Sequence, residues 1–398
     1  MPNAMIFEEL GITCLPTVDG HDIAALQKSL KDALEYNGPI LVHAVTNKGA
    51  GYAPAANDPE KFHGIGSYKI ESGETLDRKA YSFTNCFTDA IMDMAQKNEK
   101  IVTLTAAMSG GVGLKKFAKA YPDRFIDVGI AEEHLVGTAA GLAKAGLKPY
   151  VAIYSAFLQR AVDQMATNVA LEKLNVCFCI DRAGIVGADG PTHHGMMDVA
   201  YTKILPGFRV IAPSCASELK RALKTAEVNN GPFAIRYPKA QCFEINNQGR
   251  ILKTSSKDET KPFKIGESRT LKKGDDAAIL AFGTSVVDAL EAHKLLKEKQ
   301  IDCRVIDMRF VKPLDTDAIS DAALCTHKIV CVEDGIKSGG AGESVLSALM
   351  DMDLCNNLKF KSLAIDDKFI PHGQIDQLKT TAKIDSESIY KAVVSLMK

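Results

Sequence analysis

The chain has almost no net charge and no long apolar run, and each shortage excludes a class of function. Its 398 residues include 48 basic and 49 acidic side chains, a formal net charge of −1, so no overall positive field points to nucleic acid or to an anionic membrane. No apolar stretch approaches the roughly 20 residues of a membrane span. The N-terminus lacks the charged and apolar regions of a signal peptide, so we expect a cytoplasmic protein.

The cysteines do not cluster into a metal site. Ten are scattered along the sequence, and the close pair is Cys177 and Cys179. On a strand these two side chains share a face, but no second pair of ligands follows nearby, so a zinc site is not predicted. We expect reduced thiols rather than disulfides.

The first segment, residues 1–77, contains too few elements to close a domain. Asp22 precedes a helical pattern with apolar residues at Ile23, Leu26, Leu30 and Leu34, and residues 39–45 have the apolar pattern of a buried strand. One helix and one or two strands cannot bury a core. We expect this segment to pack on the following domain or on another chain.

Two α/β segments follow, at residues 78–245 and 262–398, separated by a polar linker at 246–261. Alternation of strands with helical patterns favours a parallel sheet with helices on both faces. The expected strands of the first segment are 101–105, 125–128, 148–153, 176–180, 209–212 and 233–236, and those of the second, smaller segment are 277–282, 302–307, 328–333 and 359–365.

The loop at residues 181–195 carries four glycines, charged side chains and two histidines directly after the apolar run 176–180. Glycine permits close approach of backbone to a ligand, and parallel strands present their carboxyl ends to ligands. The pattern is typical of a functional loop. The alternative is a glycine-rich surface loop without a ligand.

With three further motifs, this loop resembles the pyrimidine-binding domain of the 1-deoxy-D-xylulose-5-phosphate synthase family, thiamine-diphosphate enzymes of the transketolase superfamily. The motifs are Ile130-Ala-Glu-Glu-His134, Tyr154-Ser-Ala-Phe-Leu-Gln-Arg160 and Arg236-Tyr-Pro238. The resemblance extends from residues 7–11 to 369–373. The family's Gly-Asp-Gly motif, which binds Mg²⁺ and the cofactor's diphosphate, is not found.

The resemblance implies an α/β fold of the transketolase type. Residues 1–77 correspond to a remnant of the N-terminal diphosphate-binding domain, residues 78–245 to the parallel-sheet pyrimidine-binding domain, and residues 262–398 to the smaller C-terminal domain. No metal ligand is expected from this chain.

The implied cofactor-binding residues are Ile130, Glu132 and Phe157. Glu132 resembles the family's catalytic acid, which hydrogen-bonds a ring nitrogen of the aminopyrimidine and must be protonated to do so. The apolar residues around Glu132 fit a partly buried helix start. Phe157 resembles the aromatic residue that stacks on the same ring.

The implied substrate-binding residues combine cations with proton-transfer groups: Tyr154, Arg160, Arg182, Asp189 and Arg236. The three arginines resemble the family's set of arginines that holds the phosphate of glyceraldehyde 3-phosphate. A guanidinium group suits this role because it can bind two phosphate oxygens at once.

Two histidines are implied to be catalytic. His193, with Asp189, would lie near the reacting carbonyl and orient pyruvate, and His63 resembles a histidine from the end of the N-terminal domain that reaches the substrate. The role of His194, where the family often has Gln, is left open.

The implied activity is the thiamine-diphosphate-dependent carboligation of pyruvate and glyceraldehyde 3-phosphate to 1-deoxy-D-xylulose 5-phosphate, with release of CO₂. We expect a homodimer, with the Mg²⁺ and diphosphate ligands supplied by a missing domain or a separate N-terminal subunit. The alternatives are a catalytically silent truncated or regulatory chain, and the C-terminal subunit of a transketolase.

Overall fold

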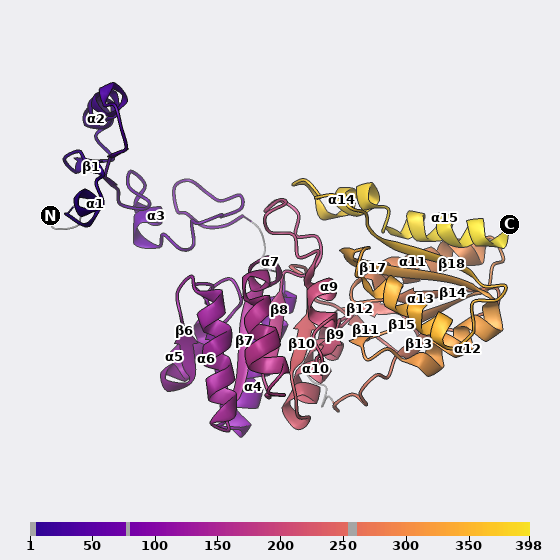
Figure 1. Ribbon diagram of the computed structural model, residues 1–398. Coiled ribbons are helices and arrows are strands. Elements are labelled where there is room, and N and C mark those ends of the chain that lie inside the picture. The colour runs from indigo at the N-terminus through magenta and orange to yellow at the C-terminus, as the bar shows by residue number, and fades with distance from the viewer. Residues whose placement is uncertain (1–4, 77–79, 254–260) are drawn as a thin grey trace. The chain divides into compact units, whose positions relative to one another are not determined.

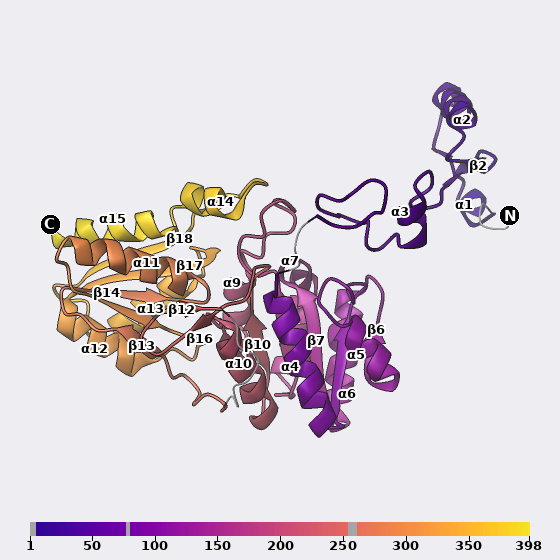
Figure 2. The ribbon, with the colours of Figure 1, turned by 180° about the vertical axis from the view of Figure 1, so that it is seen from behind.

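The computed structural model describes residues 5–76, 80–253 and 261–398 (Figures 1 and 2). By its internal contacts the chain divides into two compact units, residues 1–79 and 80–398. The predicted pyrimidine-binding and C-terminal segments thus lie together in the second unit.

The first unit is built from short elements with little buried apolar surface. Helix α2 begins after Asp22, whose carboxylate accepts a hydrogen bond from the backbone N–H of Ala25. Ile23 is 70% exposed and Leu34 is 87% exposed, as expected for a segment that does not close its own core. The elements are α1 (Met5–Glu9), β1 (Thr13–Cys14), β2 (Val18–Asp19), α2 (Ile23–Glu35), β3 (Ile40–Leu41), β4 (Ala44–Val45) and α3 (Ala53–Asn57).

One expected strand of this unit is broken in two. Residues 39–45 were expected to form a single strand, but β3 pairs with β1 and β4 pairs with β2, each in a separate two-stranded parallel sheet. Both pairings are only two residues long.

The second unit contains a seven-stranded sheet in the order β16-β9-β10-β8-β7-β5-β6. All six expected strands are confirmed to within two residues, and they run parallel. The strands are β5 (Ile101–Thr105), β6 (Phe125–Asp127), β7 (Lys148–Tyr154), β8 (Cys177–Asp181), β9 (Arg209–Ile211), β10 (Phe233–Arg236) and β16 (Phe310–Lys312).

Helices cover both faces of this sheet, so its central strands are fully buried. Figure 1 shows α6 in front of the sheet, and Figure 2 shows α4 and α10 on the opposite face. Its helices are α4 (Phe83–Lys97), α5 (Lys115–Ala120), a 3₁₀ turn (Pro122–Arg124), α6 (Glu132–Lys144), α7 (Ser155–Leu158), a 3₁₀ turn (Gln159–Ala161), α8 (Val162–Gln164), a π-helix (Met165–Ala170), α9 (Asp198–Lys203) and α10 (Ala216–Val228).

A five-stranded sheet in the order β13-β15-β14-β17-β18 forms the C-terminal part of the unit. The four expected strands are confirmed and run parallel, and antiparallel β13 was not expected. The elements are β13 (Arg269–Lys272), β14 (Ala277–Ala281), α11 (Ser285–Glu298), β15 (Cys303–Asp307), α12 (Thr316–Thr326), β17 (Lys328–Ile336), α13 (Ala341–Asp351), β18 (Lys359–Ile365), α14 (Ile375–Ala382) and α15 (Ser386–Met397).

The two sheets are joined by more than the linker between them. Strand β16 leaves the C-terminal segment and pairs antiparallel with β9. Beside it, Arg309 Nε donates to Glu218 of α10 at 2.6 Å, and both side chains are buried. At the start of the expected linker, β11 (Glu244–Ile245) and β12 (Ile251–Leu252) pair as an antiparallel hairpin.

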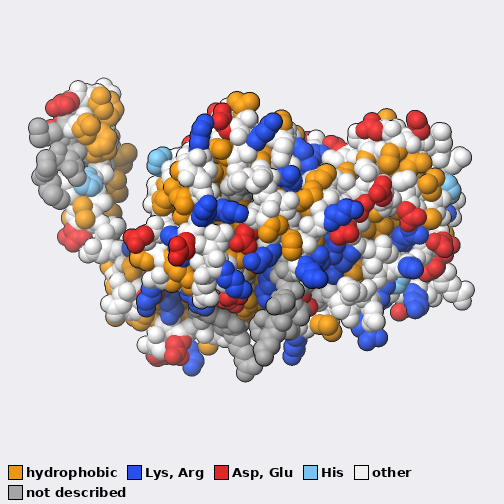
Figure 3. Space-filling view, turned by 90° about the horizontal axis from the view of Figure 1, so that it is seen from below, with side chains coloured by type: hydrophobic (Ala, Val, Ile, Leu, Met, Phe, Trp, Pro, Cys, Tyr) orange, Lys and Arg blue, Asp and Glu red, His pale blue; other side chains and the backbone are white. Residues whose placement is uncertain are grey.

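Charges of both signs are mixed on the surface (Figure 3), and the cysteines are reduced thiols. Lys and Arg are interspersed with Asp and Glu over the face shown in Figure 3, in keeping with the near-neutral composition. All ten cysteines lie within the described residues, and none forms a disulfide. Within the described ranges, no helix combines the length and apolar character needed to cross a bilayer.

Candidate active site

Glu132 is enclosed by protein at the first residue of α6, just beyond the carboxyl end of β6. Its side chain is 4% exposed, and Arg160 Nη1 donates to its Oε2 at 3.2 Å. Arg160 is at the rim with 60% of its side chain exposed, so solvent screens this pair and it contributes little to stability. The carboxyl group therefore does not face bulk water.

The residues around Glu132 leave an apolar surface uncovered. Ile130, two positions earlier, is 78% exposed, whereas Leu135 and Val136, one turn later in α6, are fully buried. An exposed isoleucine beside a buried carboxyl group is a surface that a flat heterocycle could cover.

Phe157 lies between two other rings at the carboxyl end of β7. Its centroid is 5.6 Å from that of Tyr154 and 5.3 Å from that of His193, the latter in an edge-to-face arrangement. Tyr154 ends β7, Phe157 lies in the short helix α7, and His193 comes from the glycine-rich loop. Phe157 is half-buried, so part of its ring remains accessible.

The glycine-rich loop begins with a strained residue. Arg182 has φ of +59°, a region that costs a non-glycine residue about 1 kcal/mol or more. Buried Asp181 holds this turn, because its carboxylate accepts from the backbone N–H of Arg182 at 2.7 Å and from the hydroxyl of Thr84 at 2.8 Å. Burial raises the pKa of Asp181 to about 6, against the effect of these hydrogen bonds.

The loop closes on itself where two glycines meet. Gly184 and Gly195 exchange backbone hydrogen bonds of 2.9 and 2.8 Å. A Cβ on Gly195 would lie 2.5 Å from the carbonyl oxygen of Arg182, so only glycine fits there. The glycine pattern thus has a structural reason in addition to any ligand contact.

Three charges meet at the mouth of this loop. Arg182 Nη1 and Lys239 Nζ both donate to Asp189 Oδ2, at 2.7 and 2.8 Å. Burial alone would raise the pKa of Asp189, but Lys239 and Arg182 together lower it. The guanidinium carbon of Arg182 also lies 3.9 Å from the centroid of the Tyr154 ring. Two cations share one carboxylate here, which leaves an excess of positive charge.

Lys239 was not among the predicted site residues. It lies three positions beyond Arg236, the last residue of β10, and its side chain is 45% exposed. Its signal in the sequence is its place after the end of a buried strand, where side chains reach the ligand-binding edge of the sheet.

Arg236 differs from the expectation of a cation open to a phosphate. Its side chain is 3% exposed; Nε donates to Asp198 at 3.0 Å and Nη1 to Asp334 at 2.6 Å. Asp334 belongs to β17 of the other sheet, so Arg236 joins the two sheets. The reason for the difference is that Asp198 of α9 and Asp334 of β17 both reach the end of β10, so the guanidinium already has two carboxylate partners.

His194, whose role was open, anchors the loop. It is buried, its Nδ1 accepts from the backbone N–H of Val186 at 3.1 Å, and its Nε2 lies 3.0 Å from the carbonyl oxygen of Pro371. A carbonyl can only accept, so Nε2 carries the proton and the ring is the neutral Nε2–H tautomer. His194 thus ties the loop to the segment before α14.

His63 lies in the first unit, exposed, with Nδ1 2.9 Å from Lys48 Nζ. Its predicted contact with substrate stays a prediction. Within the described residues, no group of three or more His, Cys, Asp or Glu side chains is arranged to hold a metal ion.

Three family models match the chain: "Transketolase, pyrimidine binding domain" over residues 79–243, "Transketolase, C-terminal domain" over 266–389, and "1-deoxy-D-xylulose-5-phosphate synthase" over 1–46. The first match spans the parallel strands of the seven-stranded sheet, and the second spans the five-stranded sheet together with β16. The third covers α1, α2 and the short strands of the first unit.

Among solved structures, one titled "Split gene transketolase, inactive beta4 tetramer" is similar with a TM-score of 0.69 at 28% identity, covering 80% of this chain and 98% of that one. A transketolase from Campylobacter jejuni, with a TM-score of 0.64 at 18% identity over 99% of this chain and 69% of its own, shares the fold.

The curated relatives are longer proteins. 1-Deoxy-D-xylulose-5-phosphate synthase 1 from Geobacter sulfurreducens is 43% identical over 396 residues, which is 99% of this chain and 60% of that protein. The synthase from Aquifex aeolicus is 42% identical over 99% of this chain and 61% of its own length. The chain thus spans about three fifths of the length of the relatives it matches. From these matches along nearly its whole length, the chain belongs to the 1-deoxy-D-xylulose-5-phosphate synthase family of the transketolase superfamily.

Proposed function

We propose that this chain supplies the pyrimidine-binding and substrate-binding part of a thiamine-diphosphate enzyme that joins pyruvate and glyceraldehyde 3-phosphate to give 1-deoxy-D-xylulose 5-phosphate and CO₂. The observation that carries the proposal is the buried carboxyl group of Glu132 beside the exposed side chain of Ile130. The names of the curated relatives support the same reaction.

The residues of this chain fit the aminopyrimidine half of the cofactor. Thiamine diphosphate, when bound, supplies a thiazolium carbon that adds to keto groups and stabilises the charge left after decarboxylation. Glu132 would hold a proton against a ring nitrogen of the pyrimidine. Ile130 and Phe157 would provide apolar contact to the ring faces, and protein around Glu132 would exclude water.

The cations at the loop mouth suit the phosphate of the aldehyde. Arg182 and Lys239 carry two positive charges against the single negative charge of Asp189, and Arg160 adds a third cation at the rim. A phosphate dianion would offset the excess positive charge. We assign Lys239 to this role in place of Arg236, which is already neutralised.

His193 and Tyr154 would position pyruvate. His193 is half-buried beside Phe157, with Nδ1 2.9 Å from the hydroxyl of Thr192. An imidazole can both donate and accept a proton, which suits transfer to or from the reacting carbonyl. Tyr154, stacked against Arg182, would set the width of the substrate channel.

We further propose that Mg²⁺ and the cofactor's diphosphate are bound outside this chain, by a separate N-terminal subunit or domain. The similarity to a split-gene transketolase and the share of the relatives' length that the chain spans support this proposal. A homodimer and a cytoplasmic location stay predictions.

Calorimetric titration of thiamine diphosphate with Mg²⁺ tests the proposal. The chain should bind weakly alone and tightly after mixing with the segment of the Geobacter sulfurreducens relative that it does not match. Tight binding by the chain alone would contradict the divided site. A catalytically silent chain would give no product with pyruvate and glyceraldehyde 3-phosphate even in the mixture.

Glu132→Gln and Glu133→Gln form a matched pair for the same mixture, because Glu133 is the exposed neighbour of buried Glu132. We expect Glu132→Gln to lower turnover by about 10²-fold or more, the usual range for loss of a positioned acid, and Glu133→Gln to stay near the parent. Equal activities would remove Glu132 from the mechanism.

A further inference from the structure

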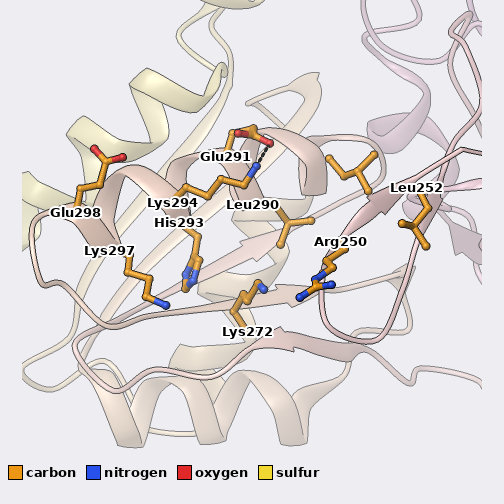
Figure 4. A pocket seen from close by; sticks show the side chains of 11 residues that line it. Arg250, Leu252, Lys272, Leu290, Glu291, His293, Lys294, Lys297 and Glu298 are labelled. Carbon is orange, nitrogen blue, oxygen red and sulfur yellow. Dashed lines mark hydrogen bonds and ion pairs between the residues drawn. The ribbon is translucent and has the colours of Figure 1, made fainter.

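A cavity of about 670 Å³ lies in the C-terminal part of residues 80–398 (Figure 4). It is bounded by the turn between β11 and β12, by β13 and by the second half of α11. None of its lining residues belongs to the candidate active site. A ligand of this cavity would therefore bind apart from the candidate active site.

The turn that forms one wall is tightly held. Asn246 Oδ1 accepts from the backbone N–H groups of Gln248 and Arg250 at 3.0 and 2.9 Å, and the backbone of Asn246 pairs with both Gly249 and Arg250. Gly249 has φ of +68°, and a Cβ there would lie 2.9 Å from Leu290 and 3.1 Å from Lys272. The turn thus sits directly on α11 and β13, which fixes the position of Arg250.

Positive charge converges on this cavity. Four permanently cationic side chains and two carboxylates line it. One carboxylate, Glu291, is paired with Lys294 at 2.6 Å, and in Figure 4 that pair lies at the upper edge. The other, Glu298, points away from Arg250 in the same view.

Three cations remain without a carboxylate partner among the described residues: Arg250, Lys272 and Lys297. Lys272 Nζ donates to the carbonyl oxygen of Gln248, which uses one of its three N–H groups and holds the ammonium at the cavity wall. Cations brought together in this way favour a multiply charged anion between them.

His293 lines the same cavity, and its pKa depends on two of the same cations. Its Nδ1 lies 2.9 Å from the carbonyl oxygen of Cys303, so Nδ1 carries a proton and Nε2 remains for a ligand. Burial lowers the pKa of His293, as do Lys272 and Lys297, against the opposing effects of the Cys303 hydrogen bond and the charge of Asp302.

We propose that this cavity binds a small molecule bearing a phosphate or diphosphate group, held by Arg250, Lys272 and Lys297. The apolar part of the lining, Leu290 with the partly exposed side chains of Ile251 and Leu252, would contact the organic part of the ligand. The combination of several cations with an apolar wall is typical of sites for small phosphate esters.

Titration of the full chain with inorganic diphosphate, followed by NMR of the histidine imidazoles, tests the proposal. The His293 signals are assigned by their loss in His293→Gln. Diphosphate should shift them to saturation and raise the pKa of His293, because an anion stabilises the imidazolium. His193 reports separately on binding at the candidate active site, so the two sites and their failures are distinguished.

The double variant Arg250→Gln, Lys297→Gln should bind diphosphate at least tenfold more weakly than the parent, since each substitution removes a charge-assisted contact. Lys294→Gln is the matched control, because Lys294 lines the same cavity but is engaged with Glu291; it should bind within about twofold of the parent. Circular dichroism checks that both variants remain folded. Unshifted His293 signals, or equal binding by the double variant and the parent, would overturn the proposal.

Discussion

Arg236→Met is the substitution that separates a structural from a substrate-binding role. In the parent, one buried guanidinium pairs with both Asp198, whose side chain is 1% exposed, and Asp334, whose side chain is 10% exposed. Methionine fills similar volume without charge, so two enclosed carboxylates lose their cation. Removal of one partner from a buried ion pair typically costs ~3–5 kcal/mol, because the remaining charge is left without compensation.

The effect should appear in the unfolding midpoint. At about 2 °C per kcal/mol for a unit of this size, a loss of that order lowers the melting temperature by roughly 6–10 °C at pH 8. The loss should be smaller at pH 5. Burial raises the pKa of Asp198 even beside Arg236, and without the arginine the folded state binds a proton that the unfolded chain has already released, so stability falls as pH rises.

Two further variants sharpen the test. Adding Asp198→Asn to Arg236→Met should recover part of the loss, because one buried charge disappears. Lys239→Met, at an exposed side chain, should leave the free energy of unfolding within about 0.5 kcal/mol of the parent. An Arg236→Met protein that melts with the parent, and whose only defect is a raised apparent constant for glyceraldehyde 3-phosphate, would refute the structural assignment.

Three other outcomes are expected. Burial raises the pKa of Glu333 to about 7, so its contribution to stability is lost as the pH rises from about 4.5 through 7. In urea unfolding, the free energy of unfolding of Glu333→Gln should match that of the parent at pH 5 and exceed it by ~1–3 kcal/mol at pH 8. Equal unfolding curves for the two proteins at both pH values would contradict this. His194→Ala should cost about 1–3 kcal/mol and expose the glycine-rich loop to limited proteolysis, whereas unchanged cleavage would argue against its anchoring role. In the reconstituted enzyme, Arg182→Gln and Lys239→Gln should each raise the apparent constant for glyceraldehyde 3-phosphate about tenfold or more while that for pyruvate changes little; equal effects on both substrates would speak against a phosphate site.

The sequence predicts the parallel strands well because each is a short apolar run bounded by polar residues. Residues 101–105 and 277–281 are buried at every position, as expected for strands covered on both faces. The expectation fails for strands whose pairing is not local. Strand β16 is three residues long, and its partner β9 lies about 100 residues earlier in the chain, so no periodicity reveals the pair.

Much of the candidate site follows from the same rule. Tyr154 and Arg182 lie at or just after the ends of neighbouring strands β7 and β8, which meet at one edge of the sheet. Their stacking, and the link from Arg182 to Asp189, are the contacts such an arrangement allows. The strained backbone of Arg182 is not visible in the sequence, because it depends on the carboxylate of Asp181.

The different environments of Arg236 and Lys239 show where strand position alone is insufficient. Both follow the rule that ligands gather at the carboxyl ends of strands, and the sequence offers no reason to prefer the lysine. The difference comes from Asp334, about 100 residues later, whose carboxylate reaches Arg236 only because β17 of the second sheet lies against the end of β10. Arg236 is thus held by carboxylates from two different elements, α9 and β17. The three-residue step from Arg236 to Lys239 therefore separates a residue that joins the sheets from one whose side chain is 45% exposed and which we propose as a phosphate ligand.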